Sequence, residues 1–387
     1  MILPPNPLSA LSDQIFELRA AGADIIRLDI GSPDLPPAPQ IVDALMRAAM
    51  RSNANSYQPH SGTASLRRAW ATMYRRVFGV TVNAEDVLPL LGSKEGIFHL
   101  SQALLKPGDV ALVPDPGYQT YAVGARFAGA EPVALPLLPE NNYLPNLEAV
   151  PIEVAQRARL LWLNYPHNPT AALAPLDFFA QAVEFCRRHD ILLCHDAAYT
   201  QVVFNGVRAP SVLEVDGAAE VAIEFNTLSK SHNMAGWRVG AVLGQTDAIK
   251  ALLRLKTHAD SGHFLPVMEA AVIALTGDQT WLVERNAIYA RRHEALLVAL
   301  KKNGLKPLPS QASLYLWCPL PGDWGSSSSF AQAVLEQAHV ALAPGTVFGC
   351  GGEGFVRFSL VQSEARLVEA ARRIGAFLSS KRAGASP

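Results

Sequence analysis

The chain has 387 residues, of which 49% are apolar, and a formal net charge of −1. This length is enough for two or three units with large cores. The nearly balanced charge gives no support for a nucleic-acid or polyanionic partner. No stretch approaches the roughly 20 apolar residues that span a bilayer. Residues 1–7 have neither the basic start nor the apolar run of a signal peptide. We therefore expect a cytoplasmic protein with no membrane partner.

The cysteines are scattered and form no pair or cluster at metal-binding spacing. They are Cys186, Cys194, Cys318 and Cys350. Because a cytoplasmic protein keeps its thiols reduced, we expect buried free thiols and no metal site.

Short apolar runs alternate with amphipathic segments in the middle of the chain. Predicted strands cover residues 110–113, 160–163, 191–194, 221–225 and 239–243, and predicted helices cover residues 95–104, 175–189 and 247–258. This alternation predicts an α/β fold with a mostly parallel sheet that helices cover on both faces. Ligands of such sheets bind beyond the carboxyl ends of the strands.

The last third of the chain has a different pattern. A long helix over residues 281–301 precedes the segment 313–318, a helix at 330–338, a strand at 355–360 and a helix near 366–378. We predict a large domain over 46–285 and a smaller α+β domain over 286–387. The first segment, 1–45, is expected to pack with the smaller domain.

Lys230 lies in the most informative stretch of the chain, between two predicted strands. Thr227, Ser229 and Arg238 accompany it. A lysine amine can form a Schiff base with an aldehyde cofactor. The hydroxyls and the guanidinium can hold a phosphate. This pattern predicts a phosphorylated aldehyde cofactor, and the alternative is an exposed lysine in a polar loop.

Two further polar groups follow predicted strands. Asp196 ends the run 191–196, where a buried carboxylate requires a cation such as a pyridinium nitrogen, or else caps the following turn. Tyr199 and Asn168 could donate to a ring oxygen of the same cofactor. Asn168 lies in an Asn-Pro turn, a common structure in its own right.

Residues near the start of the predicted helix 95–104 suit a phosphate. Gly92, Ser93 and Lys94 offer free main-chain N–H groups, although Ser93 could simply cap the helix. Tyr118 follows a Pro-Gly turn and could stack on a flat ring or pack on the core.

Arg357 lies within an apolar strand, and arginine is rarely buried without an anion. A substrate α-carboxylate is one partner, and a structural salt bridge is the alternative. Gly31 could bring a main-chain amide to the same carboxylate, and Tyr57 is a further candidate for contact with the phosphate.

Together these motifs resemble the aspartate-aminotransferase-type, class I/II family of pyridoxal-phosphate enzymes, which has the fold-type-I architecture. The resemblance runs from about residue 30 to the last helix. It implies a large domain with a seven-stranded, mostly parallel sheet, a smaller α+β domain and pyridoxal 5'-phosphate as cofactor. It also implies a homodimer with shared active sites, in which Tyr57 reaches the phosphate in the neighbouring subunit.

The resemblance assigns a role to each motif residue. Lys230 would be the Schiff-base lysine, and Asp196 would pair with the pyridine nitrogen. Arg357, Gly31 and Asn168 would contact the substrate. The remaining cofactor contacts would come from Tyr57, Gly92, Ser93, Lys94, Tyr118, Asn168, Tyr199, Thr227, Ser229 and Arg238.

Three positions depart from the family pattern. Ala171 stands where glycine is frequent, Thr227 where serine is frequent, and Ser231-His232 where a hydroxyl residue and tyrosine are common. None of these removes a reacting group.

The motifs look most like those of alanine and LL-diaminopimelate aminotransferases. This similarity implies a ping-pong transfer of an amino group between an amino acid and a 2-oxo acid such as 2-oxoglutarate or pyruvate, with a place in amino-acid metabolism and, for the second enzyme, lysine biosynthesis. The sequence does not separate the two. A C–S β-lyase shares this site and is the alternative enzyme. A cofactor-binding regulator is disfavoured because too few residues precede Gly31 for a DNA-binding domain.

Overall fold

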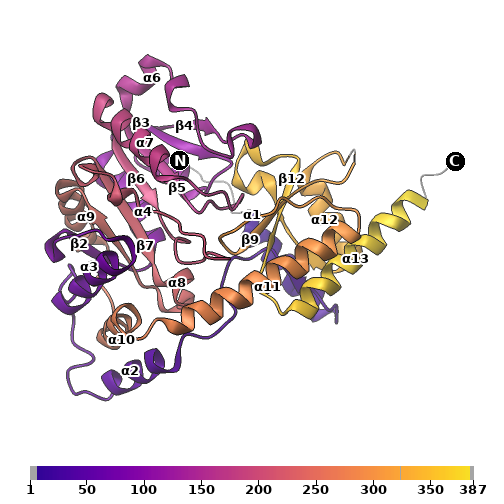
Figure 1. Ribbon diagram of the computed structural model, residues 1–387, viewed down its shortest axis with the longest axis horizontal. Coiled ribbons are helices and arrows are strands. Elements are labelled where there is room, and N and C mark those ends of the chain that lie inside the picture. Colours follow the sequence, from indigo (N-terminus) through magenta and orange to yellow (C-terminus); the bar gives the residue numbers. More distant parts are fainter. Residues whose placement is uncertain (1–6, 323, 384–387) are drawn as a thin grey trace.

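A computed structural model describes residues 7–322 and 324–383 (Figure 1). The expectation that residues 1–7 do not form a signal peptide concerns residues that lie largely outside this range. A seven-stranded sheet with the order β2-β8-β7-β6-β5-β3-β4 forms the larger part of the molecule. Strand β8 runs antiparallel to both neighbours, and the strands from β7 to β4 are parallel. The strands of this sheet are β2 (Val87–Leu90), β3 (Val110–Asp115), β4 (Glu131–Pro136), β5 (Ala158–Asn164), β6 (Leu192–Asp196), β7 (Ala222–Thr227) and β8 (Gly240–Gly244).

Helices cover both faces of this sheet. Successive side chains of a strand point to opposite faces, so Leu161 and Leu163 pack in one core while Leu160 and Trp162 pack in the other. The first core includes α3 (Ala64–Phe78), α7 (Leu176–His189) and α10 (Leu265–Thr276), and the second includes α4 (Ser93–Leu104), α5 (Thr120–Phe127) and α9 (Thr246–Ala259). The predicted α/β class with a mostly parallel, helix-covered sheet is confirmed.

A smaller antiparallel sheet, in the order β11-β12-β9, lies at the other end of the molecule (Figure 1). Its strands are β9 (Tyr315–Pro319), β11 (Ala343–Pro344) and β12 (Phe355–Ser359), and the helices with it are α11 (Thr280–Lys302), α12 (Ser327–Ala338) and α13 (Glu364–Ala383). Phe330, Phe358 and Leu367 share one core there. The long helix α11 runs from the vicinity of α8 (Leu228–Ser231) to this smaller sheet (Figure 1).

The N-terminal segment contacts both units. Ile15 of α1 (Pro7–Ala20) packs with Leu335, and β1 (Ile26–Arg27) pairs with β10 (Val340–Ala341). The next helix, α2 (Pro39–Ala49), instead packs in the core of the large sheet, together with α10. We therefore propose that the smaller domain comprises the segment up to about Leu28 together with the chain from about residue 286. The remaining short helix, α6 (Ile152–Arg157), precedes β5.

The predicted thiol environment needs one correction. Cys186, Cys194 and Cys318 are buried, whereas Cys350 is exposed in a turn between β11 and β12. All four thiols are free. Within the described ranges, no helix is long and apolar enough to cross a membrane, and no group of side chains could hold a metal ion.

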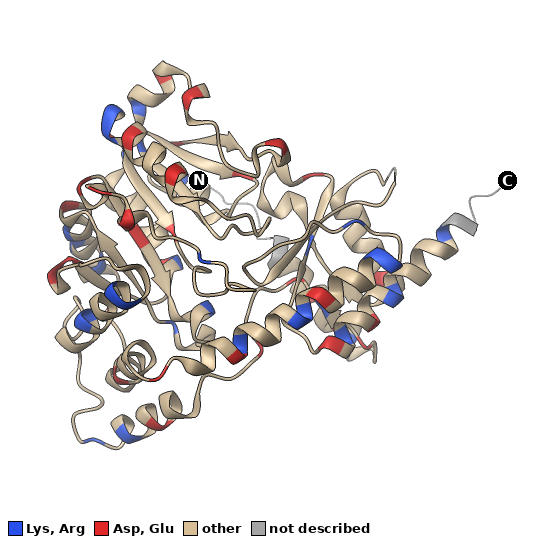
Figure 2. Cartoon of the chain, in the orientation of Figure 1, with Lys and Arg blue, Asp and Glu red and all other residues tan. Residues whose placement is uncertain are grey.

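Charged residues of both signs are mixed over the elements (Figure 2). Helix α13, for example, carries Glu364 and Glu369 beside Arg366 and Arg373, and Arg366 and Arg373 both pair with Asp24. Figure 2 shows no large region of one sign over the described chain, in agreement with the nearly neutral composition.

Candidate active site

A cavity of about 340 Å³ lies where the carboxyl ends of the parallel strands meet the smaller unit. Parallel strands bring their carboxyl ends to one edge of the sheet, and Asn164, Asp196 and Thr227 each end a strand there. The cavity is lined by Asp29, Ile30, Gly31, Ser32, Ser93, Lys94, Tyr118, Asn164, Asn168, Asp196, Ala198, Tyr199, Thr227, Ser229, Lys230, Arg238, Tyr315 and Arg357.

Lys230 is carried by α8, the short helix that follows β7. Thr227 begins this helix, because its hydroxyl accepts a hydrogen bond from the main-chain N–H of Ser229 at 3.1 Å. The Lys230 amine donates to the carbonyl oxygen of Gly31 at 2.5 Å. Burial, together with the positive charges of Arg357 and Arg238, lowers the pKa of Lys230 from 10.5 to about 8. The amine is thus more readily deprotonated than a free lysine, as a nucleophile or base requires.

Asp196 is a buried carboxylate at the end of β6. It accepts a hydrogen bond from the hydroxyl of Tyr121 at 2.8 Å and a weaker one from the N–H of Ala198 at 3.3 Å. Burial raises the pKa of Asp196, and the hydrogen bond from Tyr121 and the charge of His195 oppose that rise. Asp196 lines the cavity and makes no salt bridge within the described residues, although the charges of His195 and Lys230 act on it.

Arg357 is a buried cation on the opposite side of the cavity. Its guanidinium donates to the side-chain oxygen of Asn168 at 2.8 Å and to the carbonyl oxygen of Asp29 at 2.6 Å. It also lies 4.0 Å from the ring centre of Tyr315. Neither hydrogen-bond acceptor carries a charge, and the Nε atom has no partner. The salt-bridge alternative for Arg357 is therefore not found in the described chain, and the guanidinium can still bind an anion.

Asn168 is held in place by a second asparagine. Asn164 donates from its side chain to the carbonyl oxygen of Asp196 at 2.7 Å and accepts the N–H of Asn168 at 2.9 Å. The turn that carries Asn168 is thus tied to the strand that carries Asp196. The sequence predicted Asn168 but not this role of Asn164.

The residues predicted to hold a phosphate meet at the start of α4. Helix α4 begins at Ser93, and no side chain caps it, so its first N–H groups are free for an anion. Arg238 points to the same place, because a Cβ atom on Gly92 would lie 2.4 Å from its guanidinium. A Cβ atom on Gly240 would lie 2.7 Å from the nitrogen of Ser93. Because Gly92 and Gly240 have no side chains, Arg238 and the start of α4 can approach each other closely.

Three tyrosines shape the rest of the cavity. Tyr118 is half-buried, and its ring packs edge-on against that of Tyr121 with centres 5.7 Å apart. The hydroxyls of Tyr199 and Tyr315 are 2.7 Å apart. A Cβ atom on Gly31 would collide with the Tyr315 hydroxyl, so this position requires glycine. Tyr315 was not predicted from the sequence, and strand β9 of the smaller unit brings it to the cavity.

The structure brings almost all of the predicted site residues together. Gly92 borders Arg238, and the others except Tyr57 line the cavity. Tyr57 is 90% exposed and lies outside it. Residues that the sequence did not predict for the site include Asp29, Ile30, Ser32, Asn164, Ala198 and Tyr315 in the lining, and Tyr121 behind Asp196.

Comparison with known proteins assigns the chain to a family. The family model for aminotransferase class I and II matches residues 23–374. The chain belongs to this family. Aminotransferases of this family depend on pyridoxal phosphate, so the chain is a pyridoxal-phosphate-dependent aminotransferase.

Several relatives of this aminotransferase are similar over almost their whole length. An LL-diaminopimelate aminotransferase from Dehalococcoides mccartyi is 44% identical over 378 residues, which cover 97% of each chain. One from Moorella thermoacetica is 43% identical, covering 96% of this chain and 95% of that protein. Among solved structures, substrate-bound BacF from Bacillus subtilis has a TM-score of 0.93 at 37% identity, covering 97% of this chain and 95% of that one. The aspartate aminotransferase from Thermus thermophilus with maleate has a TM-score of 0.91 at 30% identity, covering 97% of both chains.

The residues of the aminotransferase cavity fit pyridoxal phosphate. The Lys230 amine matches the aldehyde of the cofactor. The buried Asp196 carboxylate, which makes no salt bridge within the described residues, matches the pyridinium nitrogen. The start of α4 beside Arg238 matches the phosphate. The glycine at position 92 leaves space for the phosphate-side arginine.

The lowered pKa of Lys230 leads to a pH prediction. In cofactor-free protein, acylation of Lys230 should rise with pH through a midpoint near 8, because only the neutral amine reacts. A free lysine derivative in the same reaction should titrate near about 10.4. Quantitative mass spectrometry of the labelled peptide would measure both. A Lys230 midpoint that coincides with that of the free derivative would contradict the desolvation argument.

Proposed function

We propose that this aminotransferase uses LL-diaminopimelate as amino donor and a 2-oxo acid, such as 2-oxoglutarate, as acceptor. The observation that carries the proposal is that Lys230, Asp196 and an Arg357 without a carboxylate partner line one cavity. The LL-diaminopimelate aminotransferases named above, at 43–44% identity, support this donor. Alanine is the alternative donor, and pyruvate the alternative acceptor.

The side chains have separate roles in this proposed reaction. Bound pyridoxal phosphate supplies an aldehyde that reacts with amines and a ring that accepts electron density. Asp196 would pair with a protonated ring nitrogen, and the Arg357 guanidinium would bind the α-carboxylate of the substrate as a fork. The Lys230 amine would take the proton from the substrate Cα as a general base. The fixed carboxylate orients the Cα–H bond and thereby favours loss of the proton over loss of CO2.

The remaining site residues hold and orient the cofactor in this proposal. Ser93 and Lys94 would bind the phosphate through main-chain N–H groups, with Thr227, Ser229 and Arg238 completing that end of the cavity. Tyr118 would stack on the ring, and Tyr199 and Asn168 would donate to its oxygen. Gly31 would offer its main chain to the substrate carboxylate beside Arg357.

Replacement of Arg357 should weaken the binding of every amino-acid substrate. In Arg357→Gln the fork that binds the α-carboxylate is lost, so KM should rise by about 30-fold or more for each donor. Exposed Arg254, on α9, offers a control, and Arg254→Gln should leave KM unchanged. Steady-state kinetics with several donors would measure the effect. An unchanged KM in Arg357→Gln would remove this residue from the carboxylate role.

A panel of amino donors tests the proposed substrate. LL-diaminopimelate, alanine, aspartate and glutamate would each be supplied with 2-oxoglutarate or pyruvate, and the amino acid and oxo acid formed would be quantified. We expect the highest kcat/KM with LL-diaminopimelate. A higher kcat/KM with alanine would replace the proposed donor. Release of pyruvate, ammonia and a thiol from cystathionine, without transamination, would favour the C–S β-lyase alternative.

We also propose a homodimer in which Tyr57 reaches the phosphate of the other subunit. Large apolar side chains near it in sequence are exposed, namely Met46 (55%) and Met50 (88%), and Tyr57 itself is 90% exposed. Sedimentation velocity should give twice the chain mass of 41.6 kDa. A monomer at micromolar concentration would rule out the shared site. The cytoplasmic location stays a prediction from the sequence.

A further inference from the structure

Glu224 on β7 is a completely buried carboxylate on the far side of the sheet from the cavity. Its Oε1 accepts from the Tyr74 hydroxyl at 2.7 Å, and its Oε2 accepts from the Ser211 hydroxyl at 2.8 Å and from the N–H of Val212 at 2.9 Å. Both hydroxyls also accept a hydrogen bond, Ser211 from the N–H of Leu213 and Tyr74 from the Asn226 amide, so each can use its own proton toward Glu224. Three donors therefore converge on Glu224, as an ionised carboxylate requires.

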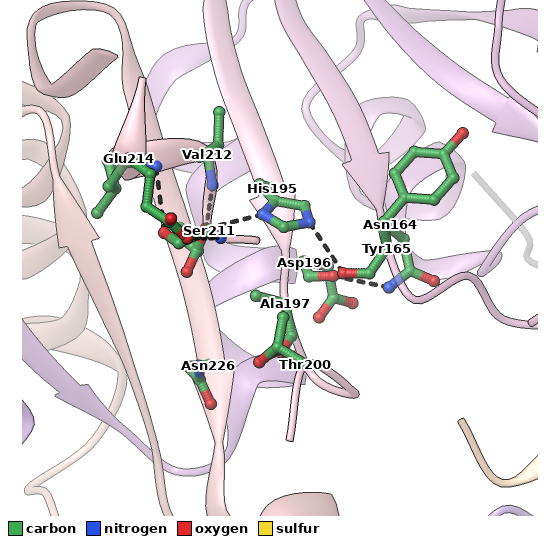
Figure 3. Close-up of polar contacts among 12 residues, drawn as sticks. Asn164, Tyr165, His195, Asp196, Ala197, Thr200, Ser211, Val212, Glu214 and Asn226 are labelled. Atoms are coloured by element: carbon green, nitrogen blue, oxygen red, sulfur yellow. Dashed lines mark hydrogen bonds and ion pairs between the residues drawn. The ribbon is translucent and has the colours of Figure 1, made fainter. Parts of the chain in front are cut away.

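His195 is the fourth partner of Glu224 and is also completely buried. Its Nδ1 lies 2.8 Å from Oε2 of Glu224, and its Nε2 lies 3.1 Å from the carbonyl oxygen of Tyr165. Figure 3 shows the ring between Tyr165, which follows β5, and the segment with Ser211. A carbonyl oxygen only accepts, so both ring nitrogens face acceptors. A neutral ring would place one lone pair against an oxygen, whereas an imidazolium satisfies both contacts.

This pair lies directly behind the proposed cofactor site. His195 precedes Asp196 on β6, and the alternation of the strand sends their side chains to opposite faces. The groups that face His195 are Glu224, the Tyr165 carbonyl and the ring of Phe179, whose centre is 4.7 Å away. Those that face Asp196 are Tyr121, Tyr199 and Lys230. A positive charge on His195 opposes the rise that burial causes in the pKa of Asp196.

The other end of the His195 ring holds the turn that carries Asn168. Tyr165 follows Asn164, and Asn164 ties Asp196 to Asn168 through its two side-chain hydrogen bonds. Figure 3 shows the Tyr165 carbonyl and the Asn164 amide beside Asp196. One imidazolium is thus connected to both sides of the cofactor site.

We propose that His195 and Glu224 form a buried imidazolium–carboxylate pair that positions the cofactor site by keeping Asp196 ionised and fixing the 164–168 turn. The inference rests on the proposed role of Asp196 toward the ring nitrogen. His195 acts through Asp196 and Tyr165 and is a positioning residue.

The protonation of His195 is measurable without cofactor. In cofactor-free protein labelled with ¹⁵N-histidine, His195 should show two protonated ring nitrogens at pH 7.5, and Glu224→Gln should leave only one protonated. The signals would be assigned by their loss in His195→Gln. A single protonated nitrogen in the wild-type protein at pH 7.5 would overturn the proposal.

Cofactor binding then tests the positioning role. Titration with pyridoxal phosphate, followed by absorbance between pH 6 and 9, should show about tenfold weaker binding by His195→Gln at pH 7. Its affinity should also fall at a higher pH than that of wild type as the pH is lowered, because Asp196 has lost the neighbouring charge. His258→Gln, on the exposed face of α9, should match wild type.

The outcomes of this titration separate the explanations. A loss of affinity that is equal at every pH would indicate packing alone and would overturn the charge role, as would unchanged binding. Failure of the wild-type protein to bind pyridoxal phosphate would instead contradict the proposed function. The NMR result would still show whether His195 is protonated on both ring nitrogens.

Discussion

Lys230→Ala is expected to lower kcat by at least about 10⁴-fold with the best donor of the panel. Lys230 supplies the amine that reacts with the cofactor and the base that takes the substrate proton, and no other lysine except Lys94 lines the cavity among the described residues. Lys94 begins α4 at the proposed phosphate end, so it does not replace this amine. Single-turnover absorbance measurements would separate the chemical step from cofactor binding.

An exposed lysine offers a matched control for this substitution. Lys250 lies on α9 and makes only a surface contact of 3.8 Å with Asp247. Lys250→Ala should therefore keep kcat within about twofold of wild type. Activity of Lys230→Ala within about tenfold of wild type would show that another group performs the proton transfer.

Asp196→Asn should produce the second large loss, of about 10²- to 10³-fold in kcat, together with weaker cofactor binding. The asparagine keeps the size of the side chain and can still accept from Tyr121, but it carries no negative charge to hold a proton on the ring nitrogen. Because burial raises the pKa of Asp196, wild-type affinity for the cofactor should fall as the pH is lowered through that pKa. This fall in cofactor affinity at low pH should disappear in Asp196→Asn.

The fall in cofactor affinity at low pH distinguishes an effect of the Asp196 charge from a structural effect of the substitution. Binding curves at several pH values would measure it, with Asp247→Asn as the control, since Asp247 is an exposed residue of α9. If Asp196→Asn kept both kcat and the pH profile of wild type, the carboxylate could not be the partner of the ring nitrogen.

The fold was predictable where burial decides the pattern. The five predicted strands of the large sheet correspond to β3, β5, β6, β7 and β8, and the long helix over 281–301 corresponds to α11. Strands β2 and β4 were missed because Pro89, Pro132 and Pro136 interrupt them, and both are edge strands, where proline is tolerated. The antiparallel direction of β8 was also not predictable, since an apolar run carries no information on direction.

The site was predictable where chemistry and position coincide. Asp196 and Lys230 follow buried strands, so an unusual polar group at a strand end was visible from sequence. Tyr315 and Asp29 reach the cavity from the smaller unit and the N-terminal segment, and only the tertiary structure brings them there. Tyr121 reads as an ordinary apolar residue of a helix until its hydroxyl is seen to meet Asp196.

His195 illustrates the same limit. A histidine within a buried run is ordinarily a neutral core residue, and Glu224 reads as a strand residue of the next apolar run. The register of β6 against β7 places His195 opposite Glu224. Only that register, with the carbonyl of Tyr165 on the other side of the ring, distinguishes a charged pair from a neutral one.

We expect the amine of Lys230 to become covalently linked to pyridoxal phosphate. Borohydride reduction of the cofactor-loaded protein, followed by peptide mapping, would detect this link. A phosphopyridoxyl group should appear on the peptide that contains Lys230 and on no other peptide. Protein that stays colourless with the cofactor, or a label fixed at another lysine, would contradict it.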